Sequence, residues 1–203
     1  MPTQAEDTKS RIFLTAAELF ADYGFDKVSI RQICEAVGIR KPTLYYYFKD
    51  KETLLLEMIN FSKKIGDEIY EEQVEKPKDF LDKIRGLIFG RKIFIEKYPQ
   101  FFRFHAMIHL FAIPEKVKQE MIQYVLSLML RFRSLLETGQ KQGYVAADED
   151  LDFLMMTLTS SLNHLTIRKF VFHDDSALTD ENLERMYRFW LKHFFVTQDK
   201  QTT

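Results

Sequence analysis

Side chains that can donate hydrogen bonds to phosphate oxygens are concentrated in one short part of the chain, residues 27–51. Six basic residues against two acidic ones give this part a local charge of +4, although the whole chain is almost neutral, with 29 basic and 30 acidic residues. A run of one threonine and three tyrosines at 43–47, TLYYY, lies inside it. Ammonium, guanidinium and hydroxyl groups suit the phosphates and base edges of nucleic acid. The near-neutral total favours a site-specific contact over general coating of a polyanion.

The sequence around this cluster predicts two short helices joined by a tight turn. Ser29 can cap the first helix, and Ile33 and Val37 give it an apolar face at helical spacing. Gly38 can take the left-handed conformation that ends a helix, and Pro42 fits the first turn of the next one. Two helices joined this closely form a helix-turn-helix, whose second helix is shaped to enter the major groove of DNA.

These residues also resemble a known family. Residues 10–57 resemble the DNA-binding domain of TetR-family transcriptional regulators, through SI at 29–30, ICEAVGI at 33–39, KPTLYYYF at 41–48 and KE at 51–52, followed by Leu54. Cys34, Val37 and Arg40 depart from the usual residues, and only Arg40 lies where it could alter the preferred operator. The resemblance implies an all-α fold. It places a three-helix helix-turn-helix DNA-binding domain at 1–50 and a helical ligand-binding and dimerisation domain at 51–203.

The resemblance assigns phosphate contacts to Tyr47 and Lys51, and a backbone contact to Tyr45. Side-chain length and chemistry add base-edge or groove contacts for the neighbouring residues. An alternative is that Leu44, Tyr45 and Phe48 form only a core stripe; we adopt it for Leu44 and Phe48. For Arg31 and Arg40, the alternative that they are merely solvated surface residues stays open. The predicted DNA contacts are Ser29, Arg31, Arg40, Lys41, Thr43, Tyr45, Tyr46, Tyr47 and Lys51.

The rest of the chain reads as helical, because hardly any segment alternates polar and apolar residues with period two. A first helix carries an apolar stripe at 13–20 and ends near Gly24, and a long helix covers 51–70. The polar segment 71–78, which contains Pro77, is the clearest break. Further helices are predicted at 79–97, 100–112, 114–142, 149–172 and 179–195, with a loop at 173–177.

A single helix-turn-helix reads only a few base pairs, so we expect a homodimer on a near-palindromic operator with half-sites about 34–36 Å apart or a multiple of that. The last two predicted helices can supply the contact, through small residues in one and an apolar stripe near the end of the chain in the other. The alternative is that both helices pack only inside their own chain. The predicted dimer residues are Thr157, Ser161, Leu183, Met186, Tyr187, Trp190 and Phe194.

The segment 100–113 is apolar on nearly every side, and such a helix is buried. The TetR resemblance implies that inner helices enclose an effector pocket, which makes the polar groups among these apolar residues candidate anchors. Phenylalanine and methionine suit a roomy apolar cavity, so we expect a mostly hydrophobic effector; plain core packing is the alternative. The predicted ligand residues are Phe101, Phe104, His105, Ile108, Tyr124, Asn163 and His164.

Other classes of function find less support. His105 and His109 stand four residues apart, a spacing that can hold a metal, but no Asp or Glu lies beside them at ligand spacing. No P-loop, dinucleotide-binding glycine motif or nucleophile elbow is present, so we expect no enzyme and no cofactor. A helical lipid-binding or scaffolding protein with a vestigial helix-turn-helix is the second alternative.

The single cysteine, Cys34, rules out an intrachain disulfide and suits a reducing cytoplasm. No run approaches the roughly 20 apolar residues that span a bilayer, and we expect no membrane partner. The resulting expectation is a ligand-responsive, DNA-binding regulator in the cytoplasm, with repression adopted from the family.

Overall fold

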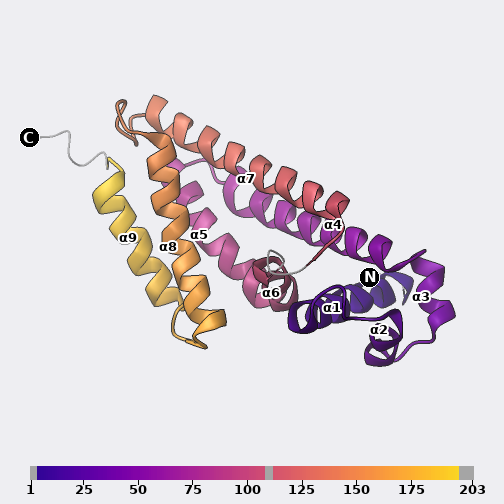
Figure 1. The fold of residues 1–203 in the computed structure, drawn as a ribbon. Helices are drawn as coiled ribbons and strands as arrows, with labels where there is room; N and C mark the ends of the chain where they lie inside the picture. The colour runs from indigo at the N-terminus through magenta and orange to yellow at the C-terminus, as the bar shows by residue number, and fades with distance from the viewer. Residues whose placement is uncertain (1–3, 108–111, 197–203) are drawn as a thin grey trace, which may run out of the picture. The chain divides into compact units, whose positions relative to one another are not determined.

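Every regular element within residues 4–107 and 112–196, the residues that the computed structural model describes, is helical, which confirms the predicted all-α class (Figure 1). None of the helices in these residues combines the length and the hydropathy needed to cross a bilayer. The elements are α1 (Gln4–Tyr23), α2 (Ile30–Val37), α3 (Lys41–Tyr47), α4 (Lys51–Tyr70), the π-helical turn η1 (Glu71–Glu75), α5 (Phe80–Lys97), α6 (Pro99–Met107), α7 (Glu115–Lys141), α8 (Leu151–Val171) and α9 (Asp180–Phe194).

Two segments differ from the predicted boundaries. The predicted break at 71–78 begins with η1, so the chain leaves α4 through a widened helical turn rather than a loop. The helix predicted at 100–112 is observed as α6, which is described over Pro99–Met107. Residues 108–111 lie outside the described part of the chain, and Ala112 is not helical. Pro114 precedes α7, as expected for a residue that cannot continue a helix.

The chain divides into two compact units. The first combines residues 1–68 with 94–124, and the second combines residues 69–93 with 125–203. The first unit therefore holds the helix-turn-helix together with α6. The division at 50/51 that the sequence suggests is one of function rather than of compactness, and it stays a prediction.

Packing of α6 against α1 explains the composition of the first unit. The rings of Phe104 on α6 and Phe20 on α1 lie 6.2 Å apart, and Arg103 forms an ion pair with Asp22 at 2.5 Å. Both phenylalanines are fully buried. These contacts join a helix of the C-terminal region directly to the DNA-binding region.

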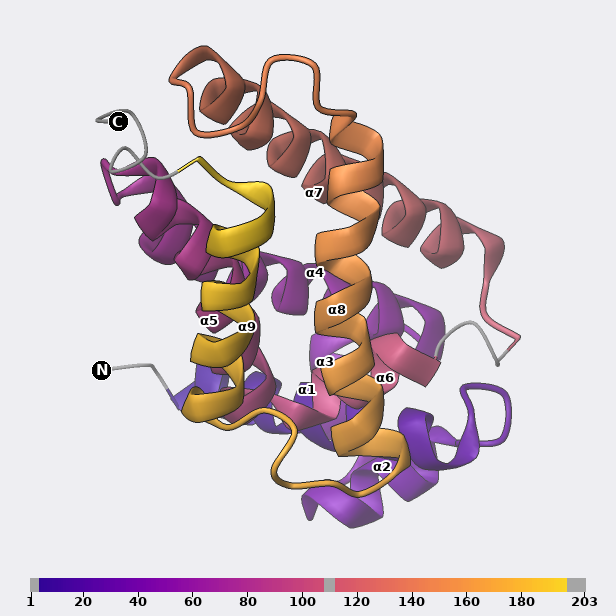
Figure 2. The ribbon, with the colours of Figure 1, turned by 90° about the vertical axis from the view of Figure 1, so that its left-hand side faces the viewer.

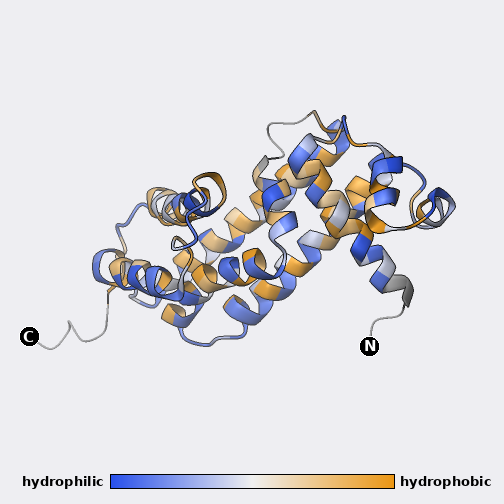
Figure 3. Cartoon of the chain, turned by 90° about the horizontal axis from the view of Figure 1, so that it is seen from below, coloured by the Kyte–Doolittle hydropathy of each residue, from blue (hydrophilic) through white to orange (hydrophobic). Residues whose placement is uncertain are grey.

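The second unit buries the inner faces of α8 and α9, which lie side by side in Figures 1 and 2. Every helix in Figure 3 carries both hydrophobic and hydrophilic residues, as expected for helices with one covered face. The Tyr187 hydroxyl of α9 donates to the Leu81 carbonyl of α5 at 3.0 Å. The buried residues of these two helices include Leu151, Leu154, Leu158, Leu162, Leu183, Tyr187 and Trp190.

A close approach between α5 and η1 depends on glycine. A Cβ placed on Gly86 would lie 1.8 Å from the carbonyl oxygen of Gln73, a backbone atom that cannot swing away. A Cβ on Gly90 would lie 3.3 Å from the nearest atom, a methyl group of Ile69. Of these two glycines, only Gly86 therefore excludes every larger residue.

We expect Gly86→Ala to lower the free energy of unfolding by about 3 kcal/mol, because α5 and η1 must separate. Gly90→Ala is the matched control and should change it by less than about 1 kcal/mol, since better helix propensity offsets mild crowding. Urea denaturation followed by circular dichroism measures both. Equal stability of the two variants would contradict the close approach.

Candidate nucleic-acid interface

The first helix of the helix-turn-helix, α2, begins with the predicted Ser29 cap. The Ser29 hydroxyl accepts a hydrogen bond from the Gln32 backbone N–H at 3.2 Å, and the Gln32 side chain accepts one from the Ser29 backbone N–H at 2.8 Å. This reciprocal capping box satisfies two backbone donors that the helix itself leaves unpaired. The Ser29 side chain is exposed, but its hydroxyl donates to the Gln32 Oε1 atom at 2.8 Å, so a phosphate would have to replace that bond.

The turn between α2 and α3 has the predicted glycine geometry. Gly38 has φ +77°, and its N–H donates to the Cys34 carbonyl at 3.0 Å. The Arg11 guanidinium of α1 donates to the Val37 carbonyl at 2.8 Å, which fixes the end of α2 against α1. Pro42 lies in the first turn of α3, as predicted.

One face of α3 is held in the core and the rest is exposed. Leu44 and Phe48 are fully buried, which confirms their assignment to packing, and the Phe48 ring lies 5.4 Å from that of Phe13. Tyr46 is 83% exposed, and its ring packs edge-on against that of Tyr47. The exposed residues of this helix are Lys41, Pro42, Thr43, Tyr45 and Tyr46.

The cations of this region differ in what they contact. Arg31 forms an exposed ion pair with Glu35 at 2.7 Å, and this pairing raises the pKa of the arginine. Within the part of the chain that the structure describes, Arg40 and Lys41 make no ion pair, and both are exposed. Arg40 and Lys41 therefore leave two cations free at the beginning of α3.

Lys51, predicted as a phosphate contact, makes structural contacts as well. Its ammonium group donates to the carbonyls of Phe25 at 2.8 Å and Val28 at 3.0 Å, and lies 4.2 Å from the centre of the Phe25 ring. Burial lowers its pKa, and Asp26 opposes the shift. Since an ammonium group has three N–H bonds, one remains for a phosphate. Its phosphate contact stays a prediction.

Three of the predicted ligand residues lie in the packed interior of the first unit. Phe101 and Phe104 are fully buried, and Phe101 packs edge-on against Phe61 of α4. Ser62 lies 3.1 Å from the Nε2 atom of His105 and donates to the Ile59 carbonyl. With its one hydrogen already used, the Ser62 hydroxyl accepts from His105, and burial lowers the pKa of that imidazole to about 4.

The remaining predicted ligand residues are placed differently. Tyr124 donates to the Lys63 carbonyl at 3.3 Å and belongs to the first unit. Asn163 and His164 belong to the second unit and are exposed, and Asn163 accepts from the Arg91 guanidinium at 2.8 Å. Ile108 lies outside the described residues, as does His109 of the metal alternative. The predicted ligand residues are thus divided between the two units, and their assignment to one ligand site stays a prediction.

The predicted dimer residues fall into two groups. Leu183, Tyr187 and Trp190 are buried within their own chain, so they are not available to a second copy. Thr157 and Ser161 are half-buried, and each hydroxyl donates to the carbonyl four residues before it. Met186 and Phe194 are also half-buried.

Sequence reasoning missed Arg11 and the carbonyl partners of Lys51. Each of these contacts joins residues between 23 and 26 positions apart. Basic residues that open a helix or lie in a neighbouring helix are common, and no local pattern marks which carbonyl they reach. Lys49, exposed before α4, is a further cation that the prediction left out.

Lys51→Met should lower the free energy of unfolding by about 1–3 kcal/mol, because two carbonyls lose their charged donor. It should also weaken binding to operator and random DNA alike. Lys49→Met, at an exposed neighbouring lysine, is the control and should leave stability within about 0.5 kcal/mol. Chemical denaturation and gel shifts measure the two effects; unchanged stability of Lys51→Met would refute the structural role.

Comparison with known proteins agrees with this geometry. Residues 12–58 match the family model described as bacterial regulatory proteins, tetR family. The HTH-type transcriptional regulator UidR of Escherichia coli (strain K12) is 39% identical over 59 residues, which cover 29% of this chain and 30% of UidR. In that alignment the chain thus spans less than a third of the relative's length.

Two further matches extend over most of the chain. The HTH-type transcriptional repressor KstR2 of Rhodococcus jostii (strain RHA1) is 26% identical over 163 residues, covering 74% of this chain and 77% of KstR2. The crystal structure of a TetR family transcription regulator from Marinobacter aquaeolei VT8 has a TM-score of 0.70 and 23% identity, over 96% of this chain and 99% of that one. With the capped α2, the glycine turn and the exposed α3, residues 12–58 form a DNA-binding domain of the TetR family.

Proposed function

We propose that the chain is a transcriptional repressor that binds a near-palindromic operator as a homodimer and is released by a small-molecule effector with a large apolar part. The observation that carries the DNA-binding step is the exposed face of α3. Leu44 and Phe48 anchor this helix in the core, while Lys41, Thr43 and Tyr46 face outward. A helix that inserts into a major groove needs one face packed against the protein core and a polar face exposed to the DNA.

The exposed side chains divide by the contact that they can make. Lys41 and Arg40, at the beginning of α3, are long enough to reach guanine acceptors. Thr43 offers a methyl and a hydroxyl group to a thymine or a phosphate, and Tyr47 offers a hydroxyl to the backbone. Base contacts select a sequence, whereas phosphate contacts set position and affinity.

Lys41→Ala should therefore reduce the ratio of operator to random-DNA binding by about tenfold. A good base contact contributes about 1–3 kcal/mol of discrimination, and each 1.4 kcal/mol or so is a tenfold change in affinity. Lys27→Ala, an exposed lysine outside α3, is the control and should leave the ratio unchanged. Gel shifts with DNA from upstream of the protein's own gene supply the operator. Equal losses on both DNAs for Lys41→Ala would count against base reading, and no binding to any duplex would favour the scaffold alternative.

The dimer contact that we propose uses the outer face of α8. Phe153, Met156, Ile167 and Val171 are each about half exposed and recur at helical spacing along this face. Phe189 of the neighbouring α9 is 54% exposed. Exposed large apolar side chains that share one helix face are typical of an interface between copies, because their contact with water is unfavourable. This face replaces the buried Leu183, Tyr187 and Trp190.

A matched pair of variants tests the contact. Ile167→Glu places a charge on α8 at a residue that is 47% exposed, and Val125→Glu does the same on α7 at 46% exposure. We expect Ile167→Glu to weaken dimerisation about 100-fold, because a charge would be buried between copies. Val125→Glu should leave it unchanged. Analytical ultracentrifugation measures both, and a wild-type monomer would refute the dimer.

Contacts inside the first unit support a route from an effector to the DNA-binding helices. Ser62 of α4 accepts from His105 of α6, and α6 packs on α1 through Phe104 and Arg103. A displacement of α6 or α4 is therefore transmitted to α1 and, through α1, to α2. An effector releases DNA only if it binds better to the arrangement that misfits the operator.

A further inference from the structure

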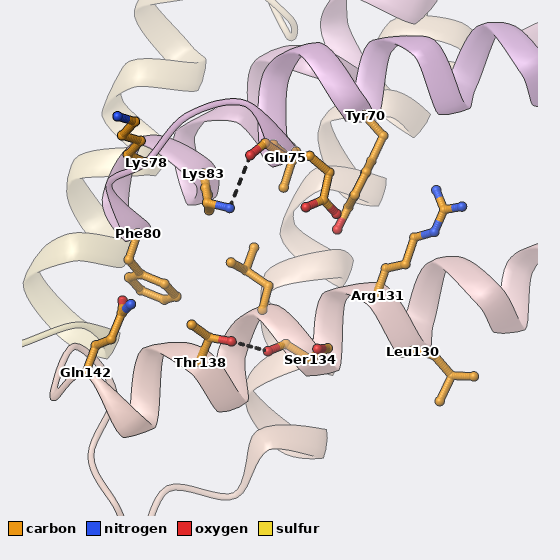
Figure 4. Close-up of a pocket in the computed structure, with 12 residues that line it drawn as sticks. Tyr70, Glu75, Lys78, Phe80, Lys83, Leu130, Arg131, Ser134, Thr138 and Gln142 are labelled. Carbon is orange, nitrogen blue, oxygen red and sulfur yellow. Dashed lines mark hydrogen bonds between the residues drawn. The ribbon is translucent and has the colours of Figure 1, made fainter.

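A pocket of about 470 Å³ lies entirely within the second unit, and none of the predicted ligand residues lines it (Figure 4). Its walls are Tyr70 with the η1 turn, the beginning of α5, and the C-terminal half of α7. The volume lies in the range of small-molecule sites, which is about 300–1,000 Å³. The pocket thus has room for a small organic ligand.

The inner surface of the pocket is apolar. Val74, Phe80 and Leu135 line it and are between 2% and 8% exposed. The Phe80 ring is held in place by stacking on Tyr144 at 5.1 Å and by an edge contact with Phe195 at 5.6 Å. A rigid apolar floor of this kind binds an alkyl or aryl group through burial of its surface.

The rim of the pocket is positively charged. Lys78, Lys83 and Arg131 line it, against one carboxylate, Glu75. The Lys83 ammonium makes a long, 3.4 Å hydrogen bond to the Glu75 backbone carbonyl, so its charge is not neutralised there. Lys78 is exposed and forms no ion pair within the described residues. Figure 4 shows the ammonium group of Lys83 directed into the pocket and that of Lys78 directed away from it, so Lys83 is the cation that favours an anion here.

Tyr70 and Arg131 close the other end. The Arg131 guanidinium lies 5.4 Å from the centre of the Tyr70 ring, and Glu75 faces the tyrosine (Figure 4). Burial first, and then Glu75, raise the pKa of Tyr70 to about 12. The phenol thus stays neutral at physiological pH, and it can donate a hydrogen bond without adding negative charge.

Uncharged donors complete the rim. In the described structure the Ser134 hydroxyl and the Gln142 amide make no hydrogen bond with the protein, and both line the pocket. Thr138, between them on α7, donates to the Ser134 backbone carbonyl at 2.9 Å. These two free donors on the rim can satisfy further oxygens of an anionic group.

We propose that this pocket binds an amphipathic anion. Its carboxylate or phosphate group lies against the Lys83 ammonium group, and its alkyl or aryl part covers Val74, Phe80 and Leu135. This site deepens the proposed function by giving the effector a place and a charge. It rests on that function only for its regulatory meaning, because binding of the anion can be measured without DNA.

Calorimetric titration with octanoate, octyl phosphate and 1-octanol tests the charge requirement on the full-length protein. We expect both anions to bind and the alcohol to bind at least about tenfold more weakly. The tighter of the two anions distinguishes a carboxylate from a phosphate ligand. Equal affinity for the alcohol would overturn the charged rim, and absence of binding by both anions would overturn the site.

Variants then locate the binding. Lys83→Gln should weaken octanoate binding about tenfold or more, and Ser134→Phe should block it by filling the pocket. Lys141→Gln, an exposed lysine of α7 outside the pocket, is the matched control. Circular dichroism confirms that each variant is folded. Unchanged octanoate affinity in both pocket variants would refute this location.

A gel shift separates this inference from the proposed function. Operator binding with no octanoate binding would overturn the site and leave the DNA-binding role intact. If the protein binds octanoate but binds no double-stranded DNA, the proposed function is overturned and the ligand site stands. If the site and the proposed function are both correct, octanoate at concentrations that fill the pocket should release operator DNA from the wild-type protein. It should not release operator DNA from the Ser134→Phe variant.

Discussion

The position of the DNA-binding helices depends on a cation that is partly withdrawn from water. Lys51 opens α4, and its ammonium group donates to two carbonyls of the segment between α1 and α2 while lying over the Phe25 ring. Burial disfavours the charge, and the carbonyls and ring offset that cost. Because α2 begins two residues after Val28, this contact fixes the beginning of the helix-turn-helix against α4. The same residue can therefore serve stability and phosphate binding at once.

The inclusion of α6 in the first unit gives the DNA-binding region a partner from much later in the chain. An ion pair and an aromatic contact join α6 to α1, and the bond between His105 and Ser62 joins it to α4. Since burial keeps His105 neutral, this bond is one between uncharged groups and does not change with pH near 7. Near pH 7, α6 is thus joined to α1 and α4 by an ion pair, an aromatic contact and a hydrogen bond between uncharged groups.

The sequence predicted what is local and missed what is distant. Ser29, Gly38 and Pro42 act on backbone groups within a few residues of themselves, so their types and spacing were enough to place α2, the turn and α3. Arg11 and Lys51 reach carbonyls more than twenty residues away, which no spacing reveals. The apolar stripe of α9 could be recognised in the sequence, but the sequence does not show which residues pack against it. Its own chain covers Leu183 and Trp190.

The π-helical turn explains why a polar segment became the wall of a pocket. A π turn carries an additional residue and often marks a functional position in a helix. Here it lets Val74 enter the core while Tyr70 and Glu75 line the pocket. The absence of a side chain on Gly86 allows α5 to approach the Gln73 carbonyl of this turn. Because η1 directly continues α4, a ligand in the pocket would touch the end of the helix whose first residue, Lys51, holds the segment before α2.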